Sequence, residues 1–323
     1  MKVLISGKVP AAVLQRIRTR HEVDMHEDDH PIDRSELLLR VRDVAGLMPM
    51  ITEKVDRELM EAARHLRIVA NHGVGYDNID VEAATDRGIW VTNTPGVLTD
   101  ATADLAFALL LAAGRRIVEG DRRTREGRFE FWAPQHFLGR EISGKVLGII
   151  GAGRIGKALA QRAKGFRMTV LYHNRRRLDA GEEKRLGLGY ATLPELLATC
   201  DYLSIHAPLT PETRHLIGPR ELAMMKPTAC LINTARGPVV DETALVEALR
   251  RRTIFAAALD VYEDEPRLSP GLAGLDNVIL TPHIGSATVE TRERMASLAA
   301  DNLLAGLEGS MPPNCLNPQA RKA

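Results

Sequence analysis

The sequence has little of several features that mark particular protein classes. Its three cysteines, Cys200, Cys230 and Cys315, show neither close pairing nor metal-ligand spacing, which fits a reducing compartment. The 43 basic and 42 acidic residues nearly cancel, so no strong field attracts nucleic acid or an anionic membrane. The most apolar segment, residues 105–113, is far shorter than the ~20 residues that span a bilayer. The first apolar run, at residues 2–6, is also too short for a signal peptide.

These absences predict a cytoplasmic protein that binds a small molecule, no nucleic acid and no membrane, and that self-associates. Three histidines at positions 21, 26 and 30 lie among acidic residues, but their spacing fits no single helix or strand face. We interpret this stretch as a solvated loop and expect no metal site.

The length of 323 residues exceeds one ordinary core and predicts two domains. A turn at Pro95 and Gly96 separates the first α/β stretch from a long helix expected from Thr99 to Ala113. The segment from Arg115 to Glu141 has weak periodicity and contains aromatic residues that need something to pack on, either a neighbouring subunit or the chain's own domain. Strands are expected at residues 2–6, 22–25, 44–48, 66–71, 89–93, 146–150, 168–172, 202–205, 230–233, 255–259 and 278–280.

Helices are expected between these strands, including residues 11–20, 55–63, 81–87, 193–199, 242–250 and 289–306. Regular alternation of strand and helix predicts doubly wound parallel sheets with right-handed crossovers. The fold class is therefore α/β, with two Rossmann-like or flavodoxin-like domains. Residues 98–285 form the expected dinucleotide-binding domain, which includes a dimerisation helix and arm. Residues 1–97 and 286–323 form a discontinuous substrate-binding domain.

The most informative motif is a glycine turn between the strand at 146–150 and a helical segment. Gly151 permits a tight turn, Gly153 lets backbone approach a pyrophosphate, and Gly156 lets helix pack against strand. The amides at the helix start, at Arg154 and Ile155, favour negative charge. Because the required strand and helix flank the glycines, the motif predicts a dinucleotide site rather than an incidental turn.

The residues after the next strand predict which dinucleotide binds. An NAD-specific site places an acidic residue here to accept from the ribose 2′-hydroxyl, but Asn174 is neutral. The following Arg175, Arg176 and Arg177 carry guanidinium groups suited to a 2′-phosphate. We therefore expect NADPH, with NADH possible but weaker; the alternative is that these arginines form a solvated surface loop.

Polar residues follow several strands at the edge where a doubly wound sheet binds ligands. Arg236 offers two parallel N–H donors to a carboxylate, and His283 is the natural proton carrier near neutral pH. Asp260 is a candidate acceptor for the nicotinamide carboxamide, and Asp264 or Glu265 for a bond from His283. The expected cofactor-binding residues are Gly151, Gly153, Arg154, Ile155, Gly156, Asn174, Arg175, Arg176, His206, Pro208, Thr213, Thr234, Ala235, Asp260 and Gly285.

A second glycine turn, at Gly73 to Gly75, ends the strand expected at 66–71. Flanking glycines let such a turn present backbone N–H groups to an anion. A substrate carboxylate is the candidate anion, with Val74 and Gly75 as donors; the alternative is a purely structural turn.

Five motifs together identify a family resemblance: GAGRIG at 151–156, HAPLTPET at 206–213, NTARG at 233–237, ALDVYEDEP at 258–266 and TPHIGSA at 281–287. Across nearly its whole length the chain resembles the D-isomer-specific 2-hydroxyacid dehydrogenases. Within them it is most similar to glyoxylate/hydroxypyruvate reductases, including those that reduce 2-ketogluconate. The subgroup rests on VGYDNID at 74–80, TPGVLTDATAD at 94–104 and NCLNP at 314–318.

The resemblance implies roles for individual residues. Arg236, Glu265 and His283 take the family's catalytic positions, and Val74 and Gly75 its substrate loop, with Arg236 and His283 also contacting substrate. It further implies a homodimer built on the helix after Asp100 and its following arm. The implied reaction is NADPH-dependent reduction of a short 2-oxo acid such as glyoxylate, hydroxypyruvate or 2-ketogluconate.

The same motifs also fit other functions. Another D-2-hydroxyacid dehydrogenase or a phosphite-type dehydrogenase would use the same scaffold with different substrate loops. A dinucleotide-sensing protein similar to transcriptional corepressors is a rival from a different class, although no low-complexity extension for partner binding is present.

Overall fold

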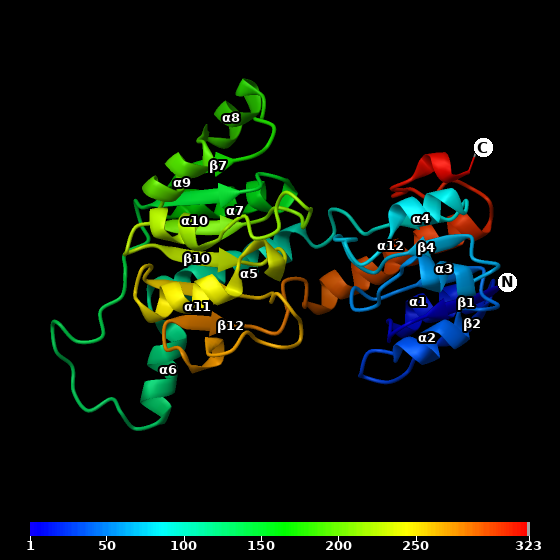
Figure 1. Cartoon of the computed structure of the whole chain (residues 1–323), viewed down its shortest axis with the longest axis horizontal. Coiled ribbons are helices and arrows are strands. Elements are labelled where there is room, and N and C mark those ends of the chain that lie inside the picture. Colours follow the sequence, from blue (N-terminus) through cyan, green and yellow to red (C-terminus); the bar gives the residue numbers. More distant parts are fainter. Residues whose placement is uncertain (322–323) are drawn as a thin grey trace. The chain divides into compact units, whose positions relative to one another are not determined.

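The computed structural model describes residues 1–321 as two compact α/β units, each with a parallel sheet between helical layers. One unit comprises Met1–Leu98 and the described part of Ser286–Ala323, and the other Thr99–Gly285. The chain thus leaves its first unit, builds the second, and returns (Figure 1). The predicted α/β class with two doubly wound domains is confirmed.

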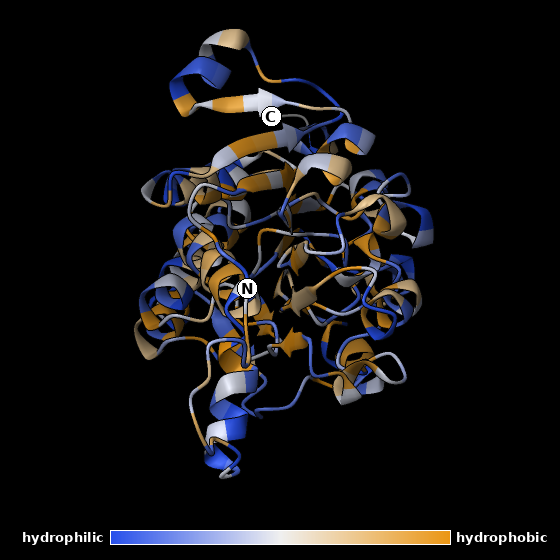
Figure 2. Ribbon diagram, turned by 90° about the vertical axis from the view of Figure 1, so that its left-hand side faces the viewer, coloured by the Kyte–Doolittle hydropathy of each residue, from blue (hydrophilic) through white to orange (hydrophobic). Residues whose placement is uncertain are grey.

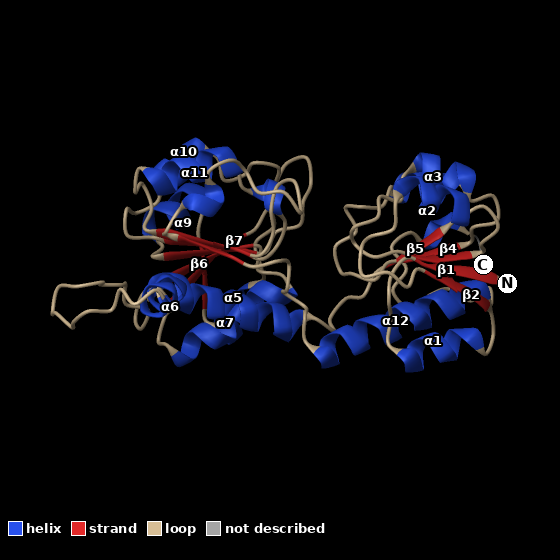
Figure 3. Cartoon of the chain, turned by 90° about the horizontal axis from the view of Figure 1, so that it is seen from below, coloured by secondary structure: helices blue, strands red, loops and turns tan. Residues whose placement is uncertain are grey.

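The first unit has five parallel strands in the order β2-β1-β3-β4-β5, which is the flavodoxin-like order. Helices α1 and α12 cover one face and α2 and α3 the other (Figure 3). Because both faces are covered, β3, β4 and β5 are wholly buried and apolar or small in sequence. The strands are β1 (Lys2–Ile5), β2 (Glu22–Met25), β3 (Gly46–Met48), β4 (Ile68–Ala70) and β5 (Trp90–Thr92), and the helices α1 (Ala11–Arg18), α2 (Arg34–Arg40), α3 (Arg57–Ala62), α4 (Val81–Asp86) and α12 (Val289–Leu307).

The second unit has seven parallel strands in the order β12-β11-β10-β9-β6-β7-β8. Counted from β6, this is the Rossmann order with one further edge strand. Helices α5 and α7 cover one face, and α9, α10 and α11 the other (Figure 3). The strands are β6 (Val146–Ile150), β7 (Thr169–His173), β8 (Leu188–Tyr190), β9 (Tyr202–Ile205), β10 (Cys230–Asn233), β11 (Ala256–Leu259) and β12 (Val278–Leu280), and the helices α5 (Thr99–Gly114), α6 (Ile117–Arg125), α7 (Arg154–Gly165), α8 (Ala180–Leu186), α9 (Leu193–Thr199), α10 (Pro219–Met224) and α11 (Glu242–Arg250).

Hydrophobic residues concentrate along the strands and the inner helix faces, while the outer faces are hydrophilic (Figure 2). In the second unit, one core lies under α5 and α7 and includes Phe107 and Leu110. A second core lies on the opposite face and includes Leu196, Leu222 and Leu245 from α9, α10 and α11. Because all of its strands are parallel, their carboxyl ends form one edge of the sheet between these two layers.

Local capping corrects some predicted boundaries. The helix expected from Val55 begins at Arg57, because the Asp56 side chain accepts from the Leu59 N–H as an N-cap. Val55 instead pairs with Ile79 in an isolated parallel bridge. The capping box of α9, in which Thr192 and Glu195 bond each other's backbone N–H, makes that helix begin where the sequence predicts.

The sequence did not predict five short elements: α2, α6, α8, β8 and α10. Helix α6 lies in the segment of weak periodicity, and none of its residues is buried. Its arginine-rich sequence has no apolar stripe facing its own unit, so a periodicity argument finds no helix there.

The C-terminal segment is fixed to β5 through the fully buried Asn317. Its Oδ1 accepts from the Val91 N–H at 2.8 Å, and its Nδ2 donates to Thr85 Oγ1 and the Ile89 carbonyl, both at 2.9 Å. One buried amide group thus supplies a partner for the Val91 N–H at the edge of the sheet, and joins the returning chain to the first unit.

Candidate active site

The glycine loop between β6 and α7 leaves room for a ligand at only one of its glycines. Gly151 has φ of +94°, and a Cβ there would lie 2.7 Å from backbone atoms of His206 and Ala207. A Cβ on Gly156 would collide with the Gly151 carbonyl oxygen. Among the described residues, no atom lies within 4 Å of a Cβ placed on Gly153. Gly151 and Gly156 therefore serve chain packing, and Gly153 leaves open space before the helix.

That open space lies at the N-terminus of α7, where Gly153 and Arg154 are exposed. The first turn of this helix carries no acidic side chain, and its leading N–H groups, including that of Ile155, lack intrahelical partners. These features fit a dinucleotide pyrophosphate, because the unpaired N–H groups and the helix dipole both favour an anion.

Asn174 directly follows β7 and turns its side chain to the glycine loop. Its Oδ1 accepts from the Ala152 N–H at 2.7 Å. The strand therefore ends without a carboxylate, and Arg175 and Arg176 follow with exposed side chains. A ribose 2′-phosphate at this position meets no fixed negative charge from Asn174.

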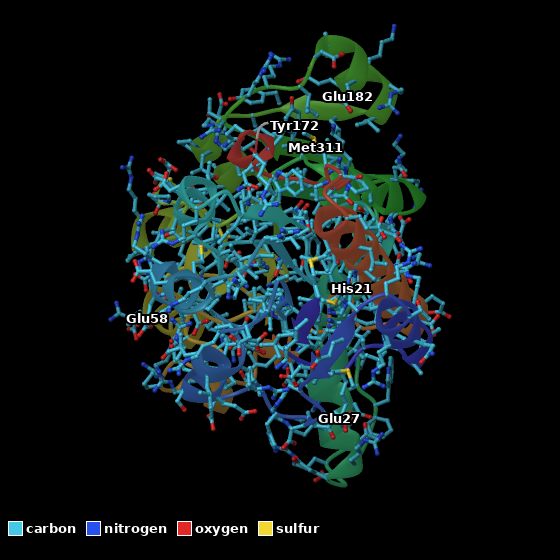
Figure 4. The ribbon with its side chains drawn as sticks, turned by 90° about the vertical axis from the view of Figure 1, so that its right-hand side faces the viewer. His21, Glu27, Glu58, Tyr172, Glu182 and Met311 are labelled. Carbon is cyan, nitrogen blue, oxygen red and sulfur yellow. The ribbon has the colours of Figure 1, made fainter. Side chains whose placement is uncertain are left out.

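Arg177, the last of the three arginines, is paired with a carboxylate of its own unit. Its Nε and Nη2 bond the two carboxylate oxygens of Glu183, each at 2.8 Å, and Tyr172 donates to the same carboxylate at 2.5 Å. These two partners lower the pKa of Glu183 to about 2. Figure 4 labels Tyr172, on β7, and Glu182, the residue before Glu183 on α8. A carboxylate of α8 thus holds Arg177, and the role of Arg175, Arg176 and Arg177 at a 2′-phosphate remains a prediction.

The loop after β9 is fixed by its own side chains. Thr213 donates from Oγ1 to the Pro208 carbonyl at 2.7 Å and accepts from the Thr210 N–H at 2.8 Å. His206 Nε2 lies 2.9 Å from Ser204 Oγ. Pro208 and Thr213 therefore lie in one rigid loop, and the predicted contacts of this loop with the cofactor remain predictions.

The end of β10 presents a polar group without a partner. Thr234 is 8% exposed, and within residues 1–321 its hydroxyl has no hydrogen-bond partner. Ala235 donates its N–H to Asn233 Oδ1 at 3.0 Å, and Asn233 Nδ2 donates to the Arg236 carbonyl at 2.9 Å. The turn that precedes Arg236 is thus fixed by Asn233, while the buried Thr234 hydroxyl remains available to a ligand.

His283 and Glu265 form a hydrogen-bonded pair, as the sequence predicts for one of its two candidate carboxylates. The distance from Nδ1 to Oε2 is 2.9 Å. Glu265 Oε1 accepts from the Tyr262 N–H at 2.9 Å. Burial opposes ionisation of Glu265, but His283, Tyr262 and Arg236 outweigh it and lower the pKa of this carboxyl. An ionised Glu265 orients the imidazole through Nδ1, which leaves Nε2 to exchange a proton with a ligand.

Asp260 holds the loop that carries His283. Its Oδ1 accepts from Thr281 Oγ1 at 2.6 Å and the Ile284 N–H at 2.8 Å, and its Oδ2 from the Gly285 N–H at 2.7 Å. Asp260 is 1% exposed. His283 itself has φ of +52°, a left-handed conformation that surrounding contacts must maintain. The predicted bond from nicotinamide to Asp260 remains a prediction, because three groups of the chain already bind it.

In the first unit, two asparagines hold the predicted substrate loop. Asn71 Nδ2 donates to the Gly75 carbonyl at 2.7 Å, and Asn93 Nδ2 donates to the Val74 carbonyl at 2.8 Å. Within residues 1–321 the structure records no hydrogen bond donated by the N–H of Val74 or Gly75. The bonds to these two carbonyls fix the turn, and the N–H groups of Val74 and Gly75 remain for an anion. Asn71 and Asn93 are not among the residues predicted from the sequence, although an amide residue directly after each of two adjacent strands is a usable signal.

Two buried histidines predict how stability depends on pH. Burial lowers the pKa of His72 and of His206 to about 4, so both are neutral in the folded protein at neutral pH. The histidines of the unfolded chain take up protons near pH 6.5, whereas those of the folded protein do so only near pH 4, so the free energy of unfolding falls as pH falls from 6.5 towards 4. Each histidine lowers the free energy of unfolding by up to about 2–3 kcal/mol across that window.

We expect the unfolding midpoint in denaturant to fall between pH 7 and pH 5, and to fall less in His72→Gln and His206→Gln. The exposed His65 supplies the control, because His65→Gln leaves the two buried imidazoles in place. Equal pH dependence in the wild type and both buried-site variants would contradict this assignment.

The described residues contain no group of three or more His, Cys, Asp or Glu side chains placed to hold a metal ion. None of the helices in residues 1–321 is both long and apolar enough to cross a bilayer.

A Rossmann unit with this glycine loop, together with its imidazole–carboxylate pair, defines an NAD(P)-dependent oxidoreductase. Residues 107–285 match the family described as D-isomer specific 2-hydroxyacid dehydrogenase, NAD binding domain. The chain belongs to the D-isomer specific 2-hydroxyacid dehydrogenases, and the resemblance predicted from its motifs is confirmed.

Similar proteins match over nearly the full length. A glyoxylate reductase of Thermococcus litoralis is 52% identical over 320 residues, which cover 98% of this chain and 96% of the relative. A solved structure from Thermus thermophilus has a TM-score of 0.91 at 48% identity and covers 98% of this chain and 100% of its own. The NADPH-dependent glyoxylate/hydroxypyruvate reductase of Sinorhizobium meliloti, solved with NADP and malonate, has a TM-score of 0.88 at 37% identity and covers 100% and 99%.

Proposed function

We propose that this enzyme reduces glyoxylate and hydroxypyruvate to D-2-hydroxy acids, with 2-ketogluconate as a further candidate substrate. The observation that carries the proposal is the His283–Glu265 pair in the same unit as the glycine loop and Arg236. The names of the similar proteins, glyoxylate reductase and glyoxylate/hydroxypyruvate reductase, support the substrate class.

Each residue has a distinct task in the proposed mechanism. Reduced nicotinamide, when bound, supplies a hydride to C2 of the oxo acid. His283 donates a proton from Nε2 to the carbonyl oxygen, and Glu265 stabilises the imidazolium through Nδ1. Arg236 binds the substrate carboxylate through its guanidinium fork. From the first unit we propose the N–H groups of Val74 and Gly75 as further donors to that carboxylate.

We further propose that NADPH is the preferred cofactor. Asn174 places no carboxylate at the end of β7, and the exposed Arg175 and Arg176 supply positive charge for a 2′-phosphate. The residues that would hold the dinucleotide are Gly151, Gly153, Arg154, Ile155, Gly156, Asn174, Arg175, Arg176, His206, Pro208, Thr213, Thr234, Ala235, Asp260 and Gly285.

Replacing the two exposed arginines tests this preference. In Arg175→Ala and Arg176→Ala we expect kcat/KM for NADPH to fall about 10-fold each, since a hydrogen bond to a charged group contributes ~1.5–3 kcal/mol. Their kcat/KM for NADH should change less than twofold. Arg185→Ala, on the surface of α8, is the control. Equal losses with both cofactors, or a wild-type preference for NADH, would refute the proposed role of these arginines.

Turnover of a substrate panel tests the function itself. We would follow NADPH oxidation with glyoxylate, hydroxypyruvate, 2-ketogluconate, pyruvate and phenylpyruvate, and repeat the series with NADH. Turnover of glyoxylate or hydroxypyruvate supports the proposal. Cofactor binding without turnover of any 2-oxo acid would favour a dinucleotide-sensing role, and turnover of phenylpyruvate alone a different 2-hydroxyacid dehydrogenase.

We propose that the enzyme is a homodimer built on α5 and the arm that follows it. Phe129, Phe131 and Trp132 in this arm are 68%, 60% and 79% exposed, and α6 buries none of its residues in the chain. Apolar side chains at such exposure are stabilised when another surface covers them. Sedimentation equilibrium should give the mass of two chains, and a monomer at micromolar concentration would contradict the proposal.

We also propose that the enzyme works in the cytoplasm. All three cysteines are free, and burial raises the pKa of the Cys200 and Cys230 thiols to about 12. Thiols of this kind are inert and need no oxidising compartment. Cell fractionation with an antibody to the chain would test this location.

A further inference from the structure

Three segments of the second unit meet at Glu263, two residues before Glu265. They are the loop after β9 that contains His215, the segment from Gly237 to the start of α11, and the loop that carries Glu263. The last two adjoin residues of the proposed active site, and hydrogen bonds and close backbone packing hold all three together.

Glu263 and Glu242 bind each other's backbone. The Glu263 N–H donates to Glu242 Oε1 at 2.5 Å, and the Glu242 N–H lies 3.4 Å from Glu263 Oε2. Glu242 is the first residue of α11 and is 1% exposed, so both carboxylates lie at the positive end of this helix. The loop before Glu265 is therefore fastened to the start of α11 by a reciprocal pair of bonds.

His215 binds the other oxygen of Glu263. Its Nε2 lies 2.5 Å from Glu263 Oε1, and its own N–H donates to the Pro238 carbonyl at 2.8 Å. His215 has φ of +52°, a left-handed conformation that is uncommon for residues other than glycine. The Glu263 carboxylate thus has partners on two different elements, α11 and the loop after β9.

Gly237 packs directly on the peptide that follows Tyr262. A Cβ at this position would collide with the Tyr262 carbonyl group and the Glu263 nitrogen. Gly237 follows Arg236, and the Tyr262 N–H donates to Glu265 at 2.9 Å. The backbone next to Arg236 and the backbone that binds Glu265 are therefore in direct contact.

We propose that Glu263, held by Glu242 and His215, is a positioning residue for the proposed reaction. It fixes the Tyr262–Glu263 peptide, and with it the adjoining Tyr262 N–H that holds the Glu265 carboxylate. This inference rests on the proposed function, because it assigns Glu265 and Arg236 their roles. The Glu263 contacts position the Glu265–His283 pair and do not themselves bind substrate or cofactor. Their loss should therefore lower kcat and leave KM nearly unchanged.

The test compares Glu263→Ala with Glu263→Gln in the full-length enzyme. We expect Glu263→Ala to lower kcat for glyoxylate about 10-fold or more, the usual scale for a residue that orients a catalytic group. The KM for glyoxylate and the Kd for NADPH should change less than about twofold, because Glu263 makes no contact with either molecule in the proposed mechanism. Glu263→Gln keeps one amide oxygen as an acceptor for its partners, so it should retain most of the activity.

Glu247→Ala is the matched control. Glu247 lies on α11, as Glu242 does, but its side chain forms ion pairs with Arg250 and Arg251 instead of bonds to the loop of Glu263. If Glu263→Ala does not fold, His215→Asn provides the second variant, because asparagine tolerates the left-handed conformation. It should show the same fall in kcat at constant KM.

The kcat values of the wild type and of the two Glu263 variants separate this inference from the proposed function. An unchanged kcat in Glu263→Ala, or equal losses in the Ala and Gln variants, would overturn the inference while wild-type turnover still supports the proposed function. A wild-type enzyme that reduces no 2-oxo acid would instead overturn the proposed function first.

Discussion

Replacing His283 by asparagine should lower kcat for glyoxylate reduction by about 10²–10⁴-fold, the usual contribution of a positioned general acid. Asparagine is a better substitute than alanine, because His283 has φ of +52° and asparagine adopts this left-handed conformation more readily. The Kd for NADPH should stay within about twofold, since the imidazole is assigned a role in proton transfer and not in binding the dinucleotide. Steady-state kinetics and a fluorescence titration measure the two quantities.

Glu265→Gln serves as the companion variant. The amide retains an acceptor for Nδ1 but loses the charge that stabilises an imidazolium, so a smaller loss of about 10–100-fold is expected. His136→Ala, which removes an imidazole from the arm, should leave kcat unchanged. If His283→Asn retained the wild-type kcat, the proton donor would have to be another group.

Replacing Arg236 by alanine should lower kcat/KM for glyoxylate by about 10²–10⁴-fold. Two charge-assisted hydrogen bonds to a carboxylate contribute roughly 1.5–3 kcal/mol each. Arg236→Lys should recover only part of the loss, because an ammonium group lacks the planar fork. Initial rates across a range of glyoxylate concentrations give these values.

A substrate without the carboxylate charge provides the control for Arg236. Methyl glyoxylate should be reduced more slowly than glyoxylate by the wild type, and Arg236→Ala should change its rate far less than that of glyoxylate. Equal losses with the ester and the acid would show that Arg236 acts on the fold or on the cofactor instead of the carboxylate.

The sequence predicts much of the fold because its strands and helices follow local rules. The run from Val146 to Ile150 is apolar because both faces of a parallel strand are covered, and it is β6 without a shift. The span of α11 is also predicted to the residue, since Asp241 caps its start. By contrast, α6 has no buried face, so no apolar period reveals it.

The sequence also predicts part of the candidate site, and the tertiary structure selects the rest. The order of strand, glycine turn and helix predicts the open space beside Gly153, and the carboxyl ends of the strands predict Arg236 and His283 as neighbours in one unit. The sequence left two candidate carboxylates for His283. The structure selects Glu265, because Tyr262 N–H holds that carboxylate 2.9 Å from Nδ1.

The sequence by itself determined the class of fold, the dinucleotide motif and the residue types at the strand ends, because each depends on neighbours within a few positions along the chain. Only the tertiary structure decided which side chains those residues meet. It assigned Arg177 to Glu183, Asn174 to the Ala152 N–H, and Glu263 to His215 and Glu242. The physical reason is that a hydrogen bond or ion pair depends on distances of a few ångströms between segments far apart in sequence, and packing of the whole unit sets those distances.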